Sequence, residues 1–324
     1  MKEAEIRPAH IFDEYLEIAR RDIEKYFSES GKKCQCPACD AEGVDAFTKH
    51  GFTYQECPAC QTLFVSPRPC SQAFSRYYEE SESSKYWATK FYKETAEARR
   101  EKLWKPKARM IQEIVEKYDR KDAEIIDIGG GYGIFAEEYE KLTDSRVTII
   151  EPGLAFADIC QQKGLSVINK FLEDLDPDDI STGHKVFVSF ELFEHLHDPA
   201  RFLQQLYKLM SPGDLFIFTT LSGMGIDIRA LWEDSKSVSP PHHLNFLNPK
   251  STGILLERTG FKLLQATTPG KLDIDILVNN RDKIKDRFWR AFIMQADDIQ
   301  KKNMQEFIST NGWSSHMLIV SQKP

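Results

Sequence analysis

Residues 125–133 read Ile-Ile-Asp-Ile-Gly-Gly-Gly-Tyr-Gly, a short apolar run that ends in glycines. Behind the glycines, apolar residues recur at helical spacing from Ile134 to Leu142. A strand, a tight glycine turn and a helix in this order are typical of nucleotide-binding α/β domains. Glycines let the backbone adopt positive φ and let a ligand approach closely, and the first turn of a helix offers unpaired N–H groups. The stretch therefore predicts a ligand site at the turn, with an ordinary tight turn as the alternative.

The spacing of the glycines indicates which ligand to expect. A dinucleotide fingerprint would need a third glycine at position 134, where this chain has Ile134. The pattern present is Asp127-x-Gly129-x-Gly131-x-Gly133. It resembles motif I of the class I S-adenosylmethionine-dependent methyltransferases. The resemblance implies that these four residues bind S-adenosylmethionine.

Strands and helices alternate from residue 124 onward, which predicts a mostly parallel sheet covered on both faces. The strands are expected at residues 124–128, 147–150, 167–168, 186–190, 215–220, 261–268 and 316–321. The resemblance implies an α/β, Rossmann-like class I methyltransferase fold with seven strands, of which the seventh is antiparallel.

Acidic residues follow the second and third expected strands. Glu151 ends the strand at 147–150, and an acid there can accept hydrogen bonds from both hydroxyls of a ribose. A surface carboxylate is the alternative for Glu151. The resemblance places further cofactor contacts, to the adenine amino group, at Leu172, Glu173 and Asp174, and the sequence does not choose between the two acids.

The segment Phe190-Glu191-Leu192-Phe193-Glu194-His195-Leu196 follows the fourth expected strand. It closely resembles the family segment Phe-Glu-x-x-Glu-His-Leu, which passes over the cofactor. The resemblance implies that Phe190 contacts the cofactor and that Glu191 faces the methyl group. Glu191 and His195 are candidate catalytic residues, and a role in tying down the loop is the alternative for His195.

A long segment of weak periodicity, residues 221–242, follows the fifth expected strand and suits substrate recognition. It leads into His243-Leu244-Asn245-Phe246, which matches a His-x-Asn-Phe segment of the family. A histidine beside the substrate can remove a proton from a hydroxyl or an amine. His243 is therefore the first candidate for a catalytic base, and a loop anchor is its alternative.

Six of the seven cysteines lie between residues 34 and 70. Four of them form two C-x-x-C pairs separated by 17 residues, a spacing that predicts a four-thiolate zinc site. The expected ligands are Cys36, Cys39, Cys57 and Cys60. Such a closed site is structural, because it leaves no open position on the metal. Free buried thiols and a redox pair are the alternatives.

The domain order follows from these signals. We expect an N-terminal helix at 1–30, a zinc ribbon at 31–70, a connecting helical segment at 71–118 and the cofactor-binding domain at 119–324, with an insertion at 269–313. The motif Leu-Phe-Val-x-Pro-Arg-Pro follows the second cysteine pair, and a Tyr-Tyr pair comes shortly after it. Together they resemble the N-terminal module of a bacterial methyltransferase group that includes sugar methyltransferases of antibiotic and surface-polysaccharide pathways.

Composition excludes several other classes. The chain has 324 residues, 41% hydrophobic content and a net charge of −7, which is ordinary for a globular protein and argues against nonspecific nucleic-acid binding. Its apolar runs are far shorter than the ~20 residues of a membrane span. The N-terminus has no apolar signal segment, so a cytoplasmic protein without a membrane partner is expected.

The resemblance implies methyl transfer from S-adenosylmethionine to a small-molecule acceptor, with structural zinc in the ribbon. A nucleotide-linked sugar in polysaccharide or natural-product biosynthesis is the expected acceptor. The insertion at 269–313 is expected either to line the acceptor pocket or to form a homodimer contact. One alternative is an NAD(P)-dependent oxidoreductase, which shares the glycine turn but leaves the segment at 190–196 unexplained. A noncatalytic zinc-ribbon adaptor is the other.

Overall fold

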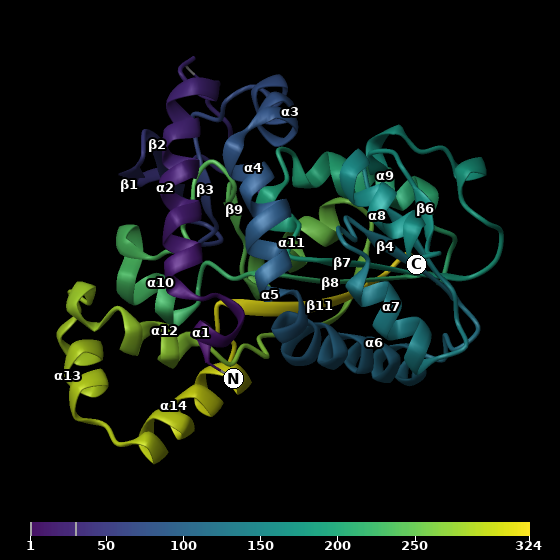
Figure 1. Cartoon of the computed structure of the whole chain (residues 1–324). Helices are drawn as coiled ribbons and strands as arrows, with labels where there is room; N and C mark the ends of the chain where they lie inside the picture. Colours follow the sequence, from purple (N-terminus) through teal and green to yellow (C-terminus); the bar gives the residue numbers. More distant parts are fainter. Residues whose placement is uncertain (1, 30) are drawn as a thin grey trace.

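The computed structural model describes residues 2–29 and 31–324, and a seven-stranded sheet forms its centre (Figure 1). The strands are β4 (Glu124–Ile128), β5 (Val147–Ile150), β6 (Ser166–Ile168), β7 (Lys185–Phe190), β8 (Leu215–Leu221), β10 (Lys262–Thr267) and β11 (His316–Gln322). Their order is β10-β11-β8-β7-β4-β5-β6, and only β11 runs antiparallel to both of its neighbours. The expected sheet, with an antiparallel seventh strand, is confirmed.

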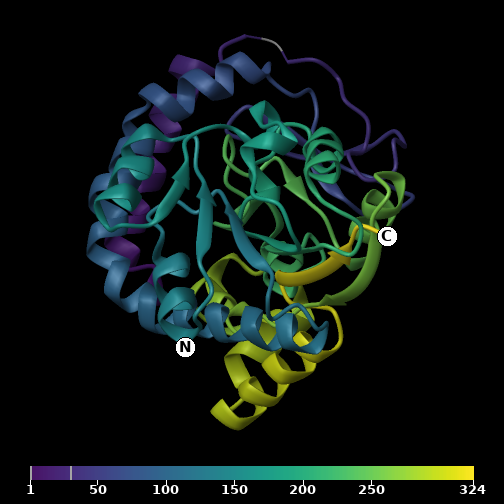
Figure 2. The same cartoon turned by 90° about the vertical axis from the view of Figure 1, so that its right-hand side faces the viewer.

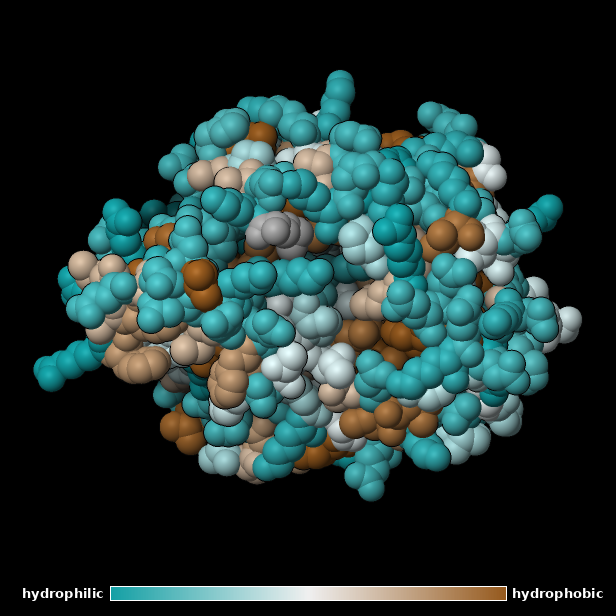
Figure 3. Space-filling view, turned by 90° about the horizontal axis from the view of Figure 1, so that it is seen from below, coloured by the Kyte–Doolittle hydropathy of each residue, from teal (hydrophilic) through white to brown (hydrophobic). Residues whose placement is uncertain are grey.

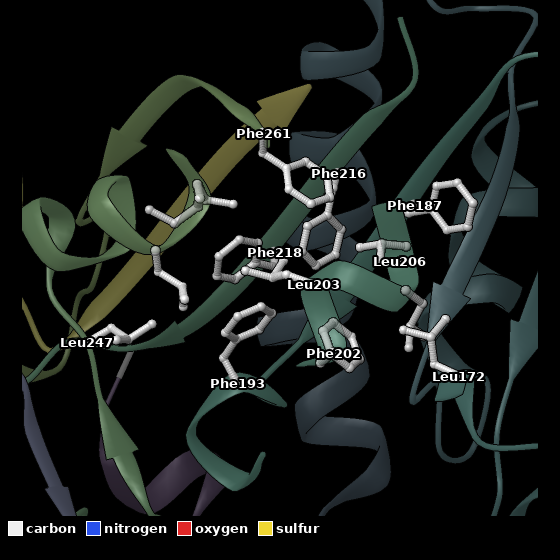
Figure 4. Packing of buried hydrophobic residues seen from close by; sticks show 14 of the residues in the cluster. Leu172, Phe187, Phe193, Phe202, Leu203, Leu206, Phe216, Phe218, Leu247 and Phe261 are labelled. Carbon is white, nitrogen blue, oxygen red and sulfur yellow. The ribbon is translucent and has the colours of Figure 1, made fainter. Parts of the chain in front are cut away.

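Helices cover both faces of this sheet. They are α6 (Lys105–Lys117), α7 (Ile134–Leu142) and α8 (Leu154–Gln162) on one face, and α9 (Pro199–Leu209) and α11 (Pro249–Arg258) on the other. Each face of the sheet has its own core, the first beneath α6, α7 and α8 and the second beneath α9 and α11. Successive residues of a strand point to opposite faces, so Leu215 and Ile217 of β8 belong to the first core and Phe216 and Phe218 to the second. Figure 4 shows the aromatic side chains of the second core packed between β8 and α9.

The caps of α9 and α11 fix where the chain leaves the sheet. Asp198 and Asn248 each precede a proline, and their side chains accept hydrogen bonds from the backbone N–H groups of Arg201 and Ser251. Both helix starts agree with the Asp-Pro and Asn-Pro signals in the sequence. Consequently the two segments that carry Glu191 to His195 and His243 end at the fixed starts of α9 and α11.

The N-terminal region contains two helices where one was expected over residues 1–30. These are α1 (Glu3–Ile6) and α2 (Ala9–Tyr26), and the ends of the expected range, residues 1 and 30, lie outside the described residues. Pro8 separates the helices because it lacks an N–H and disfavours helical geometry in the residue before it. Arg7 accordingly has φ −147° and ψ 72°.

A run of helices connects this region to the central sheet. It comprises α3 (Ser71–Glu80), α4 (Glu82–Tyr86), α5 (Tyr92–Arg99) and the π-helical turns Trp87–Phe91 and Arg100–Trp104 that join α4, α5 and α6. Figure 2 shows α2 to α5 as a purple and blue layer along one side of the sheet. These helices therefore pack beside the central sheet and do not form an extended linker.

The zinc-ribbon region forms a second sheet of four strands. Its strands are β1 (Val44–Lys49), β2 (Phe52–Glu56), β3 (Leu63–Val65) and β9 (Asn245–Phe246). The last strand belongs to the segment that follows β8, and Leu63 pairs with Phe246. The ribbon is thus joined by backbone hydrogen bonds to the segment that directly follows the predicted substrate loop.

The insertion folds into three α-helices, α12 (Asp273–Asn279), α13 (Arg287–Gln295) and α14 (Asp298–Thr310), with a 3-10 turn at Arg281–Lys283. The last two project from the body and expose large apolar side chains, and Figure 3 shows apolar residues gathered over this part. These side chains are Phe288, Met294, Ile299 and Phe307. No helix among the described residues is both long and apolar enough to cross a membrane.

Candidate functional site

The glycine turn lies between β4 and α7, at the carboxyl end of the sheet. Gly129, Gly131 and Gly133 have φ of 74°, 53° and 69°, which favour glycine. A Cβ at Gly133 would lie 2.5 Å from Leu165 Cδ1, whereas a Cβ at Gly131 would meet nothing within 4 Å. Gly133 is therefore required for packing, and the space beside Gly131 is open to a ligand.

Glu151 holds the glycine turn from the end of β5. Its carboxylate accepts hydrogen bonds from the backbone N–H groups of Gly131 (2.9 Å) and Gly153 (2.8 Å). The side chain is buried, and burial raises its pKa although the two N–H donors act in the opposite direction. The predicted ribose-binding acid thus lies against the turn, as such a role requires.

Asp127 lies beneath the same turn with one unpaired carboxyl oxygen among the described residues. It is 1% exposed, and its Oδ2 has no hydrogen-bond partner among the described residues. Burial, together with the charge of Glu151, raises the pKa of Asp127 to about 8. Buried polar atoms are normally paired, so an orphaned carboxylate here fits a cationic group on a bound ligand.

Arg99 of α5 is a functional candidate that the sequence analysis missed. Its Nε is buried and lacks a hydrogen-bond partner among the described residues, and its guanidinium lies 5.8 Å from the ring centroid of Tyr92. Tyr92 stacks on Tyr132 of the glycine turn at 4.1 Å, and the charges of both Arg99 and Asp127 act on the Tyr92 hydroxyl. In residues 71–118 the sequence pointed to aromatic residues, such as Tyr86 and Trp87, as a candidate cover of the cofactor or substrate, but no pattern pointed to a cation there.

Two exposed apolar side chains flank the ends of β5 and β6 and were also missed. Leu154 is 66% exposed and Phe171 is 52% exposed, although both are large and apolar. In the sequence, both are large apolar residues that come three or four positions after a strand of the parallel sheet. An exposed apolar side chain at the carboxyl end of such a strand is a candidate ligand contact.

The remaining predicted cofactor residues differ in how they are placed. Leu172 is buried in the core beside α9, so a ligand can reach only its backbone (Figure 4). Glu173 and Asp174 are exposed on the same short turn. Phe190 is buried at the end of β7 against Trp104 and Phe135.

Glu191 sits at the end of β7 in a left-handed conformation, with φ 53°. Its carboxylate accepts hydrogen bonds from Lys107 Nζ (2.7 Å) and Thr219 Oγ1 (2.8 Å), and His316 Nδ1 lies 3.5 Å away. Burial acts to raise the pKa of Glu191, but the charges of Lys107 and His316 outweigh it and hold the pKa well below its usual range. Glu191 is therefore a fixed, ion-paired carboxylate.

Glu194, His195 and His243 come together although 48 residues separate His195 from His243. One side-chain ligand atom from each lies within 4.8 Å of the other two. His243 Nδ1 donates to the backbone carbonyl of Ser237 at 2.6 Å, which leaves Nε2 as the proton-accepting nitrogen. Burial lowers the pKa of His243 to about 4, so the ring is neutral at pH 7.

The loop that carries His243 is fixed from several sides. His242 Nε2 is bonded to the hydroxyls of Tyr15 (2.5 Å) in α2 and Tyr77 (2.7 Å) in α3. The Tyr54 hydroxyl of β2 donates to the His243 carbonyl at 2.8 Å. The N-terminal helices and the ribbon therefore both position His243, the first candidate base.

The same loop joins two of the sequence motifs. Arg68, from Leu-Phe-Val-x-Pro-Arg-Pro, donates to Asn245 Oδ1 at 2.8 Å, and Asn245 belongs to the His-x-Asn-Phe segment. Both side chains are buried. The two motifs are thus in direct contact, although 177 positions separate Arg68 and Asn245 in the sequence.

Cys36, Cys39, Cys57 and Cys60 bring their sulfur atoms together, all within 4.8 Å of one another. The Cys36–Cys60 and Cys39–Cys57 sulfur separations are both 3.5 Å. Four thiolates around a zinc ion with bonds of ~2.3 Å lie about 3.8 Å apart, so the donor set fits tetrahedral zinc. All four ligands come from protein, as a structural site requires.

Comparisons with known proteins agree with this geometry. A family model described as a methyltransferase domain matches residues 96–266. The ubiquinone biosynthesis O-methyltransferase of Colwellia psychrerythraea is 31% identical over 126 residues, a match that spans 36% of this chain and about half (48%) of the relative.

Solved structures give more distant similarities. A methyltransferase from Archaeoglobus fulgidus has a TM-score of 0.44 at 15% identity, covering 67% of this chain and 94% of that one. The plantazolicin methyltransferase BamL has a TM-score of 0.48 at 12% identity, covering 77% and 93%. The fold assignment rests on the strand order of the sheet.

Proposed function

Because the chain belongs to the methyltransferase-domain family and is an S-adenosylmethionine-dependent methyltransferase, we propose that its acceptor is a small molecule, specifically a nucleotide-linked sugar. The observation that carries the cofactor assignment is a pair of buried polar atoms that have no partner among the described residues, Asp127 Oδ2 beneath the glycine turn and Arg99 Nε in α5. Arg99 lies next to Tyr92, which stacks on Tyr132 of that turn. An amino-acid moiety carries one ammonium and one carboxylate, and these two side chains are complementary to them.

The other residues at the carboxyl edge suit the adenosine moiety. We assign Glu151 to the ribose hydroxyls, Leu154 and Phe171 to the faces of the adenine ring, and Glu173 or Asp174 to its amino group. When bound, S-adenosylmethionine supplies a methyl group on a sulfonium, which is a good leaving group. The protein therefore has mainly to orient the acceptor and exclude water.

The acceptor side is formed by the ends of β7 and β8 and the loop after β8. We assign His243 to receive the acceptor proton at Nε2, because its Nδ1–H is held by Ser237 and burial keeps the ring neutral. Glu191, fixed by Lys107, orients the acceptor, and His195 lies beside His243 with ring centroids 4.8 Å apart.

Two observations support the acceptor class. The N-terminal ribbon and its following motif resemble those of sugar methyltransferases, and the curated relative is by name an O-methyltransferase of a small-molecule pathway. An oxygen atom of a sugar is therefore the proposed methyl acceptor. The oxidoreductase and adaptor alternatives have no support from the family match.

A turnover assay tests this proposal. Purified protein is incubated with S-adenosylmethionine and a panel of nucleotide-linked sugars, and S-adenosylhomocysteine release is measured. His243→Gln is expected to lower kcat by about 100-fold, the usual effect of losing a general base, while S-adenosylhomocysteine affinity stays within about twofold. His184→Gln, at an exposed histidine, is the control. Unchanged turnover in His243→Gln contradicts the role of His243, and an inactive wild type with every sugar contradicts the acceptor class.

A further inference from the structure

A partly open cavity of about 240 Å³ lies between α2, the turn that joins β1 to β2, the segment after β8 and the 3-10 turn that follows α12 (Figure 1). We propose that this cavity binds the phosphate groups of the acceptor. The inference rests on the proposed function, because it gives a place to the diphosphate of a nucleotide-linked sugar. None of the residues assigned above to the cofactor or to proton transfer lines the cavity.

Cations gather around this cavity although the chain has a net charge of −7. Its lining contains four of them, Arg20 of α2, Lys49 of β1, Lys236 and Lys283. Lys236 pairs with Asp13 at 2.5 Å, whereas the other three take part in no ion pair among the described residues. Like charges that are held together without counter-ions repel one another, and a bound anion relieves this repulsion.

The two carboxylates in the lining, Glu233 and Asp234, do not neutralise these cations. Both face Lys285, whose Nζ lies 2.5 Å from Glu233 Oε1 and 3.6 Å from Asp234 Oδ2. Lys285 does not line the cavity, so a cation from outside compensates part of their charge. The cavity therefore keeps a surplus of positive charge.

The lining cations lie close enough to act on one another. Burial lowers the pKa of Lys49 to about 8, and the charge of Lys283 acts in the same direction against the two carboxylates. Burial, together with the charges of Lys49 and Arg20, also lowers the pKa of His50, which lines the same cavity. Positive charges from separate elements therefore meet at one place, as an anion site requires.

The segment after β8 joins this cavity to the candidate base. Lys49 Nζ donates to the Ser235 carbonyl at 2.8 Å. The carbonyls of Ser237 and Ser239 accept hydrogen bonds from the Nδ1–H and the backbone N–H of His243, at 2.6 and 3.0 Å. The charge of Lys49 also acts on His243. The cavity and the base are therefore neighbours, and an acceptor held by its phosphates in the cavity can present its sugar to His243.

The size of the cavity suits one part of a ligand. Pockets that enclose a whole drug-sized ligand measure ~300–1,000 Å³, so about 240 Å³ fits a diphosphate better than a complete nucleotide-linked sugar. Arginine binds phosphate through its planar fork and lysine binds it as a point charge. Arg20 and Lys283 are exposed and make no side-chain hydrogen bond among the described residues, so both can turn toward a bound phosphate.

Isothermal titration with inorganic pyrophosphate tests the site on the full, zinc-loaded chain at low salt. Wild type is expected to bind about one pyrophosphate per chain. Arg20→Gln and Lys283→Gln should each bind it about five- to tenfold more weakly, because each loses a charged contact that solvent partly screens. Arg21→Gln is the matched control, since Arg21 is exposed on the same helix and does not line the cavity, and it should bind as wild type does.

A second set of measurements identifies the source of the phosphate. Nucleotide-linked sugars from the turnover panel should displace pyrophosphate, whereas the corresponding free sugars should not. With a sugar that is methylated, Arg20→Gln and Lys283→Gln should raise the KM of the acceptor about five- to tenfold and leave kcat within about twofold, because the phosphate contact is the same in the ground state and the transition state.

The outcomes separate the phosphate site from the proposed function. No pyrophosphate bound by wild type, undiminished affinity in both variants, or equal loss in Arg21→Gln overturns the site, while turnover of a nucleotide-linked sugar would still support the acceptor class. Bound pyrophosphate that no nucleotide-linked sugar displaces overturns the assignment to the acceptor and indicates a site for free phosphate. Pyrophosphate binding without turnover of any sugar rejects the acceptor class, and the assignment with it.

Discussion

Asp127 is a single buried residue whose ionised form is less stable in the ligand-free protein than it would be beside a cationic group of a bound ligand. Its Oδ2 has no partner among the described residues, and burial raises the pKa of Asp127 to about 8. The ionised form of Asp127 therefore destabilises the fold when no cation is bound beside it. An ordinary aspartate in the unfolded chain has a pKa of about 3.9. The folded state therefore holds this proton more tightly, and stability falls as pH rises from about 4 and levels off above about 8.

This pH dependence gives a prediction for Asp127→Asn, measured without cofactor. The variant cannot ionise, so its melting temperature relative to wild type should increase from pH 5 to pH 8 and then become constant. Thermal unfolding at several pH values measures the difference, in which the titration of all other groups cancels. A difference independent of pH would contradict an ionisable, unpaired Asp127.

Arg99 gives a second prediction at the same scale. Arg99→Gln removes the cation assigned to the cofactor carboxylate, and losing a charge-assisted hydrogen bond costs about 1.5–3 kcal/mol. S-adenosylhomocysteine should therefore bind about 10- to 100-fold more weakly. Arg100→Gln is the control, because the neighbouring Arg100 pairs with Glu137 and Glu138 of α7. Calorimetry that finds equal affinities in wild type and Arg99→Gln rejects this role.

At the scale of elements, the ribbon and the loop after β8 are one unit. β3 pairs with β9, and Asn248 Nδ2 donates at 2.8 Å to the carbonyl of Cys60, one of the four clustered cysteines. Together with the Tyr54 contact to His243, these bonds connect the metal site to the catalytic candidates. The ribbon therefore supports the segment that follows β8, and a metal held by its four cysteines would have no open position for chemistry.

Zinc removal should consequently loosen the loop before the central sheet. In Cys57→Ser, amide hydrogen exchange is expected to accelerate at residues 244–247, while β4 and β5 keep their protection. Turnover should fall more than cofactor affinity. Cys34→Ser is the control, because Cys34 lies outside the four-cysteine group. Unchanged exchange at 244–247 in a zinc-free variant would show that the ribbon does not support the loop.

At the scale of the whole molecule, the sequence predicts the central sheet well and its surroundings poorly. Apolar runs, glycine turns and Asp-Pro or Asn-Pro helix starts are local signals, and they place the seven strands and α9 and α11 within a few residues. The four-cysteine group and the turn with Glu151 were also found, because their spacing encodes their contacts.

Contacts between distant segments left no such signal. β9 contains only two residues and pairs with a strand some 180 residues earlier, and Tyr15 reaches His242 across 227 residues. In the helical run over residues 82–117, the sequence pointed to Tyr86 and Trp87 as a candidate cover of the ligand. In the structure, Tyr92 stacks on Tyr132 of the glycine turn, and Arg99 lies next to Tyr92. The expected homodimer stays a prediction, for which the exposed side chains of α13 and α14 are the candidate contact.

The cofactor at the glycine turn is the claim on which the whole account depends, and isothermal titration with S-adenosylhomocysteine tests it most directly. Wild type should bind one molecule per chain, and Glu151→Ala should weaken binding about 100-fold, because two charged hydrogen bonds to the ribose are lost. Glu80→Ala, at an exposed acid, should bind as wild type does. Absence of binding to the folded, zinc-loaded wild type, or equal affinity in a folded Glu151→Ala, would contradict the account.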